Sequence, residues 1–65
     1  MLKIKLLSYP LKIDQVNELL LFMIYHGIDD IPHLLKCQKG QLIKLEGYGA
    51  SVEESIKIIR QNPQD

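Results

Sequence analysis

A glycine turn between two apolar segments constrains the fold of this chain more than any other feature. The turn is Gly47-Tyr48-Gly49, and glycine accepts the positive φ angles that a tight connection needs. The apolar residues around it are Leu42, Ile43 and Leu45 before the turn and Val52, Ile56 and Ile59 after it. The second group recurs at i, i+4 and i+7, which is the spacing of one helix face. We therefore expect a short helix over Gln41–Leu45, after a turn at residues 38–40, and a second helix beyond the hairpin.

The second helix carries its own start and stop signals. Ser51 and Glu54 form the pattern of a capping box, in which each side chain accepts a hydrogen bond from the other residue's backbone N–H. Pro63 disfavours helical geometry at Asn62, the residue before it. The sequence therefore predicts a helix from Val52 to about Gln61.

An earlier helix is predicted from Val16 to Tyr25, with Asp14 as its N-cap and Gly27 as the residue that ends it. Residues 19–25 are apolar without interruption, so they cover the whole circumference of a helix. Two interpretations stay open: the helix is buried at the centre of the bundle, or part of it contacts a partner. The partner-interface residues would then be Leu20, Met23 and Ile24.

A short helix is predicted between these two. Asp29 or Asp30 is suited to be its N-cap, and Pro32 is tolerated in a first helical turn. The helix is expected to run to about Cys37. Its buried residues would be Ile31, Leu34 and Leu35.

The N-terminal segment has a different pattern. Residues 2–7 alternate apolar side chains with lysines at their start, which is a strand-like period of two. We interpret them as an extended arm packed on the helices; a strand paired with a second chain and a fraying helix are the alternatives. Pro10 breaks the segment because it disfavours helix at Tyr9. The expected organisation is an arm at residues 1–10, a helical domain at residues 11–62 and a tail at residues 63–65.

The composition fits one small intracellular domain. Sixty-five residues make a single core of marginal stability. The lone cysteine excludes an internal disulfide and favours a reducing compartment, so we expect a cytoplasmic location. No signal peptide is recognisable, and no apolar run approaches the ~20 residues of a membrane span. Eight basic and eight acidic side chains give no net charge, which argues against strong nonspecific binding to nucleic acid.

Neither catalysis nor metal binding is indicated. The soft ligands of the chain are His26, His33 and Cys37, whereas a zinc site needs four ligands, or three and a water. A Cys–His nucleophile pair also needs an orienting group and a pocket. The carboxylates at residues 29–30 and 53–54 are suited to the first turns of helices. We therefore expect no enzyme activity, no cofactor and no metal.

The hairpin region resembles the helix-hairpin-helix motif, whose pattern is Leu-x-x-Leu-x-Gly-x-Gly followed seven residues later by an aliphatic residue. The matching positions are Leu42, Leu45, Gly47, Gly49 and Ile56. The resemblance implies that backbone N–H groups of the turn and of the following helix start contact a DNA phosphate. Helix N-termini favour anions in this way.

A wider resemblance includes the residues before the hairpin. Residues 26–35 are similar to the Gly-Ile-x-x-Ile-x-x-Leu-Leu segment of the C-terminal domain of the bacterial RNA polymerase α subunit, and the likeness covers about residues 11–60. That family reads the DNA minor groove with an arginine and, three residues later, an asparagine; the matching positions here are Glu18 and Leu21. A lysine and a serine follow the family's hairpin glycine, where this chain has Ser51-Val52. The resemblance implies the fold and a role associated with transcription, while the DNA-contacting side chains differ.

We therefore predict an all-α fold, a compact bundle of four short helices with a helix-hairpin-helix-like unit and an extended N-terminal arm. The leading functional hypothesis is a non-catalytic module that binds another protein or itself, without membrane contact. The alternative is a domain that binds nucleic acid weakly through phosphates, and a purely structural hairpin is a third interpretation. The nucleic-acid contacts would be Lys36, Lys39, Lys44, Gly47, Tyr48, Gly49, Ala50 and Ser51.

Overall fold

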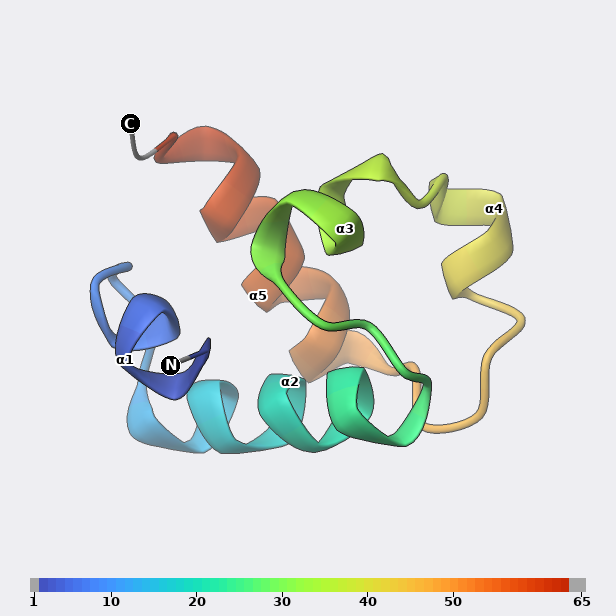
Figure 1. The fold of residues 1–65 in the computed structure, drawn as a ribbon, viewed down its shortest axis with the longest axis horizontal. Helices are drawn as coiled ribbons and strands as arrows, with labels where there is room; N and C mark the ends of the chain where they lie inside the picture. The colour runs from blue at the N-terminus through green and yellow to red at the C-terminus, as the bar shows by residue number, and fades with distance from the viewer. Residues whose placement is uncertain (1, 64–65) are drawn as a thin grey trace.

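Helices α2 and α5 pack against each other, and α2 lies along one edge of the molecule (Figure 1). The computed structural model describes residues 2–63, in which α2 spans Ile13–Tyr25 and α5 spans Ala50–Gln61. Three short helices complete the fold: α1 at Leu2–Leu7, α3 at Ile31–Lys36 and α4 at Lys39–Leu42. No strand occurs among the described residues. The prediction of a compact all-α bundle is therefore confirmed, with five helices in place of four.

The prediction of an extended N-terminal arm is wrong, because residues 2–7 form helix α1, which packs against α2. Leu2 and Leu6 lie one turn apart, and Leu6 is fully buried while Leu2 is partly buried. Ile4, which a strand would place beside them, is 65% exposed. The helix is followed by Ser8, whose hydroxyl donates to a carbonyl oxygen one turn back at 2.6 Å. Helical geometry thus buries the two leucines without a partner strand.

Helix α2 starts earlier than predicted. Its first residue is Ile13, and Lys12 is the N-cap. The Gln15 side-chain oxygen accepts a hydrogen bond from the Lys12 N–H at 2.9 Å, which satisfies one of the free donors at the helix start. Asp14 is therefore not the N-cap. It lies in the first turn, where its charge complements the helix dipole.

The other end of α2 confirms the predicted role of Gly27, which adopts φ +68°. The Gly27 N–H donates to the Ile24 carbonyl oxygen at 3.2 Å, and the Ile28 N–H donates to the Met23 carbonyl oxygen at 2.8 Å. These two bonds form a Schellman motif, with the buried Ile28 just beyond the turn. A residue with a side chain would adopt this φ only with strain.

Helix α3 has the predicted cap. The Asp30 carboxylate, and not that of Asp29, accepts a hydrogen bond from the His33 N–H at 2.8 Å. Pro32 lies in the first turn, as expected. Of the side chains expected in the core, the buried ones are Ile31 and Leu34, and Leu35 is partly buried.

Helix α4 begins at Lys39 instead of Gln41, so Gly40 is helical and not part of a turn. Its single turn ends at Leu42, whose side chain is buried. The prediction of helix at residues 43–45 is wrong, because this segment belongs to the connection to α5. Because α4 is so short, packing of Leu42 holds it in place more than its own backbone bonds do.

The predicted capping box of Ser51 and Glu54 is wrong. Helix α5 begins at Ala50 with Gly49 as its N-cap, and no side chain caps it. Ser51 is therefore already helical, and a capping side chain must come from the residue before the helix. At its other end the helix stops at Gln61, as predicted.

One hydrophobic core joins the helices. The core residues from α2 are Val16, Leu19, Phe22 and Met23, and those from α5 are Val52, Ile56 and Ile59. The fully buried Ser55 hydroxyl among them donates to the Ser51 carbonyl oxygen at 2.8 Å. Within residues 2–63 no helix has the length and apolar character needed to span a membrane. The predicted tail lies largely at residues 64–65, outside the described residues.

Candidate functional site

The connection between α4 and α5 contains the two predicted hairpin glycines, and they have different conformations. Gly47 adopts φ +91°, whereas Gly49 is extended at φ −157°. A Cβ atom at Gly47 would lie 3.7 Å from Phe22 Cδ1, an ordinary contact, so the φ angle and not the space requires glycine there. The expected need for positive φ is therefore met at Gly47 only. The assignment of this connection to a helix-hairpin-helix unit stays a prediction.

Aromatic and imidazole rings hold this connection against α2. The His26 Nε2–H donates to the Glu46 carbonyl oxygen at 2.6 Å. The Phe22 ring lies 4.7 Å from the His26 ring and 6.0 Å from the Tyr48 ring, centroid to centroid. The backbone around Gly47 is thus fixed relative to the C-terminal half of α2.

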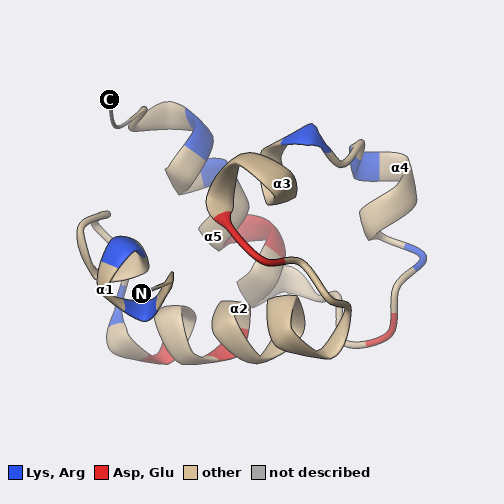
Figure 2. Ribbon diagram, viewed as in Figure 1, with Lys and Arg blue, Asp and Glu red and all other residues tan. Residues whose placement is uncertain are grey.

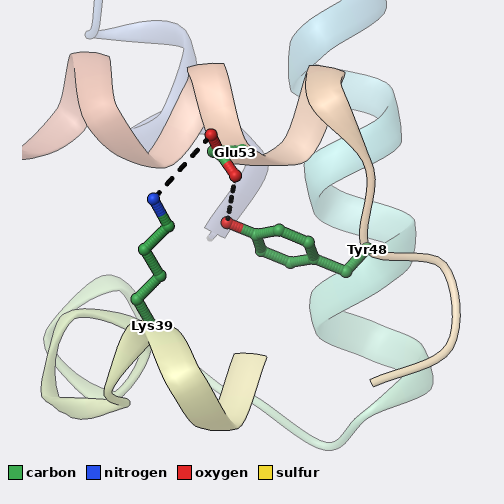
Figure 3. Close-up of polar contacts among 3 residues, drawn as sticks. All are labelled: Lys39, Tyr48 and Glu53. Atoms are coloured by element: carbon green, nitrogen blue, oxygen red, sulfur yellow. Dashed lines mark hydrogen bonds and ion pairs between the residues drawn. The ribbon is translucent and has the colours of Figure 1, made fainter. Parts of the chain in front are cut away.

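A three-residue polar cluster links α4, the connection and α5 (Figure 3). The Tyr48 hydroxyl donates to Glu53 Oε1 at 3.4 Å, and Lys39 Nζ lies 3.9 Å from Glu53 Oε2. Burial raises the pKa of the Tyr48 phenol above its ordinary value of 10.0, and the charge and hydrogen bond of Glu53 raise it further. The Lys39 and Glu53 side chains are 74% and 50% exposed, so water screens their ion pair and its contribution is small.

The start of α5 is the predicted phosphate site. Its first intrahelical bond runs from the Glu53 N–H to the Gly49 carbonyl oxygen at 2.9 Å, so the N–H groups of residues 50–52 precede the ladder. Glu53 and Glu54 lie in the same part of the helix and are exposed. Their carboxylates already complement the positive helix end, which reduces its attraction for a phosphate.

Basic residues occur elsewhere, at the end of α3, at the start of α4 and along α5, as well as on α1 (Figure 2). Lys39, Lys57 and Arg60 line a groove of about 440 Å³ between α4 and α5, which we call the α4–α5 groove. The Arg60 guanidinium donates from Nη2 to the carbonyl oxygens of Leu35 at 3.1 Å and Cys37 at 3.4 Å. Arg60 therefore also holds α5 to the end of α3.

The predicted nucleic-acid residues are only partly brought together. Lys39 and Tyr48 line the α4–α5 groove, and Lys36 and Lys44 do not. The groove residues that sequence reasoning missed are Lys57 and Arg60. Their spacing from Glu53, at i+4 and i+7, places all three on one face of α5 and was a usable signal.

The second surface is the side of α2 that points away from the core, which we call the outer face of α2. Its apolar members are Ile13, Leu21, Ile24 and Tyr25, with Leu20 at its edge, packed in part against the core. Ile13 is 57%, Leu21 67%, Ile24 64% and Tyr25 72% exposed, while Leu20 is partly buried.

The outer face corrects the predicted partner interface. Met23 cannot contact a partner, because its side chain is 0% exposed and packs in the core. Ile24 is exposed and Leu20 is partly exposed, as a partner contact requires. Leu21 and Tyr25 were missed, although they are the most exposed of the large apolar side chains on α2. The helix is thus not buried on all sides, and residues 2–63 leave this face of it uncovered.

A groove of about 490 Å³ adjoins this face, which we call the α2–loop groove. Apolar lining comes from Leu21, Phe22, Tyr25 and Val52, and Gly47 lines its far side. The charged residues that line it are Glu18 and Glu46. This surface is therefore apolar with acidic margins, in contrast to the α4–α5 groove.

Metal and thiol chemistry find little geometric support. Cys37 is partly buried, and its Sγ–H donates to the His33 carbonyl oxygen at 3.5 Å. In the described part of the chain, no group of three or more His, Cys, Asp or Glu side chains is placed to hold a metal ion.

Comparison with protein-family models, curated protein sequences and solved structures finds no match to this chain. The resemblance to helix-hairpin-helix domains and to the polymerase α C-terminal domain therefore stays a prediction. The two grooves and the outer face of α2 are the features on which a functional proposal rests.

Proposed function

We propose that the chain is a non-catalytic interaction module that binds a protein through the outer face of α2. One observation carries the proposal: Ile13, Leu21, Ile24 and Tyr25 each expose more than half of their surface on a single helix. Single exposed apolar side chains are ordinary on a folded protein, whereas several that adjoin on one helix form a patch. The largest apolar patch of an ordinary monomer covers roughly 300–600 Å² and is often a binding site.

The arrangement of the patch supports protein as the ligand. Leu21, Ile24 and Tyr25 cluster in the last two turns of α2, which suits contact with apolar side chains of another chain. Contact would remove apolar surface from water, and each Å² buried contributes about 25 cal/mol. Among residues 13–25 the charged side chains are Asp14 and Glu18, and no lysine or arginine is present to attract phosphates.

Site-specific photo-crosslinking in cells of the source organism tests this proposal. A photoreactive amino acid replaces Leu21 in one variant and Tyr25 in a second, and exposed Gln41 on α4 is the control position. We expect a covalent adduct of discrete mass at both α2 positions, either with a second copy or with another protein, and none at Gln41. Absence of adducts at the α2 positions, or equal labelling at Gln41, would contradict the proposal.

Nucleic-acid contact is a second candidate, favoured by the cations in the α4–α5 groove. Lys39 and Lys57 can each reach a phosphate, although Glu53 competes for Lys39. With so few contacts, binding to short duplex DNA should be weak and salt-sensitive, with a slope of about −0.9 per contact in a log–log plot.

Fluorescence anisotropy with a short DNA duplex tests this candidate. Lys39→Gln and Lys57→Gln should each reduce the magnitude of the slope of log affinity against log salt concentration by about one unit. Lys44→Gln, outside the groove, should leave this slope unchanged. Glu53→Gln should strengthen binding because it removes a competing carboxylate. No binding by the wild-type chain at low salt would exclude this candidate.

A further inference from the structure

The α2–loop groove has a charge pattern that specifies its ligand more closely. We propose that it binds a cationic amphipathic segment of a partner, with apolar side chains against Leu21 and Tyr25 and lysine or arginine beside Glu18 and Glu46. This inference rests on the proposed function and names the chemistry of the partner. The groove has apolar walls between two carboxylates and no basic residue in its lining.

The apolar part of the groove is shaped by residues of unequal burial. Phe22 and Val52 are buried at 5% and 3% exposure and form its floor, while Leu21 and Tyr25 stand 67% and 72% exposed beside them. An apolar side chain that enters between Leu21 and Tyr25 would be shielded from water by both of them and by the floor of the groove. Apolar anchors spaced at i, i+3 and i+4 of a helix suit such a groove.

The two carboxylates lie on different elements. Glu18 belongs to α2, one turn before Leu21, and Glu46 belongs to the connection before α5. Both side chains are exposed, and neither has an ion-pair partner among the described residues. They remain free to pair with cations on an incoming segment, and complementary charges at a rim raise the association rate and exclude acidic partners.

The position of the Glu46 margin is fixed before any ligand arrives. The Glu46 carbonyl oxygen accepts the 2.6 Å bond from His26, so the backbone there is tied to the end of α2. The Tyr25 ring, which lines the groove, meets the His26 ring edge to face at 5.0 Å. A binding surface that is ordered in advance loses less entropy on association.

Calorimetric titration with two synthetic peptides tests the inference. One peptide has leucines at helical i, i+3, i+4 and i+7 spacing with lysines at the remaining positions; the other has glutamates in place of the lysines. We expect the lysine peptide to bind and the glutamate peptide not to bind. Higher salt should weaken the binding of the lysine peptide, because salt screens the charges at an exposed rim.

Variants of the chain locate the binding. The double variant Glu18→Gln, Glu46→Gln should bind the lysine peptide with an affinity roughly five- to tenfold lower than that of the wild-type chain. Glu54→Gln removes an exposed carboxylate outside the groove and should leave affinity unchanged. Leu21→Ser should abolish binding, and circular dichroism of each variant would show that the fold is kept.

Three results would overturn the inference. Equal binding of both peptides, abolished by Leu21→Ser, would leave an apolar interaction surface and remove the preference for cations. Binding of neither peptide would also refute the inference, while the crosslinks at Leu21 decide the proposed function separately. The third result comes from sedimentation of the chain alone. If the chain self-associates through this face and thereby excludes the lysine peptide, the occupant of the groove is a second copy of the chain.

Discussion

The His26 imidazole donates a hydrogen bond from Nε2 to the carbonyl oxygen of Glu46 at 2.6 Å, across twenty positions of sequence. This bond joins the end of α2 to the connection that precedes α5, and it sets the margin of the α2–loop groove. His26→Ala should cost about 1 kcal/mol of unfolding free energy, the typical net contribution of one hydrogen bond. The matched control is His33→Ala, whose side chain is exposed. Thermal unfolding measures both, and equal stability of the two variants would show that the bond contributes nothing.

The two hairpin glycines should respond differently to the same substitution. Gly47→Ser forces a side chain into φ +91°, a conformation that costs on the order of 1–3 kcal/mol. Gly49→Ser should be neutral or slightly stabilising, because Gly49 is extended and is the N-cap of α5, a position that serine favours. Urea unfolding of the two variants gives the comparison. A greater loss of stability at Gly49 would contradict the backbone conformation described here.

Helix capping provides a second matched pair. Asp30→Ala should cost about 1 kcal/mol, because the His33 N–H loses its acceptor, and this lowers the melting temperature by roughly 4–8 °C in a domain of this size. Ser51→Ala should change stability by less than about 0.5 kcal/mol, because Ser51 lies inside α5 and does not cap it. A larger loss for Ser51→Ala would support the capping box predicted from the sequence.

The raised pKa of Tyr48 predicts that the unfolding free energy depends on pH in the alkaline range. Its pKa is raised in the folded chain, so the neutral phenol is favoured there more than in the unfolded chain. The corresponding stability is fully present below the ordinary value of 10.0 and is lost as pH rises through the folded pKa. The unfolding free energy of the wild-type chain should therefore fall more steeply above that pH than that of Tyr48→Phe.

Comparison of the two chains in urea at several pH values isolates Tyr48 from the other tyrosines. Glu53→Gln should reduce the effect without removing it, because burial of the phenol is the larger cause of the shift. Parallel pH profiles for wild type and Tyr48→Phe would mean that the Tyr48 phenol titrates alike in the folded and unfolded chains.

The features that could be predicted from sequence are local ones, which depend on one residue or on the apolar spacing within one helix, as in α5. Asp30 needs only its own carboxylate and a nearby N–H to cap α3, and Gly27 needs only its freedom of φ to end α2. The N-terminal segment shows the opposite case. Leu2, Ile4 and Leu6 satisfy the alternation of a strand, and only packing against α2 decides that Leu2 and Leu6 turn inward together.

The functional surfaces were harder to predict for a related reason. The apolar run at residues 19–25 has no polar residue to mark its outward side, so its sequence does not reveal that Met23 is buried and Leu21 exposed. Contact with α5 sets that orientation. Lys57 shares a face of α5 with Glu53. That Lys57 and Lys39 line the same groove depends on where α4 packs, which is a tertiary relationship.

The most direct test of the account maps where the chain touches protein. Isotope-labelled chain is mixed with extract of the source cells, and the amide signals are followed by nuclear magnetic resonance. We predict selective broadening at Leu21, Ile24 and Tyr25, which lie on the outer face of α2, with unchanged signals at Lys57 and Gln61 on α5. Broadening confined to α5, or none at the outer face of α2, would contradict the claim that this face binds protein.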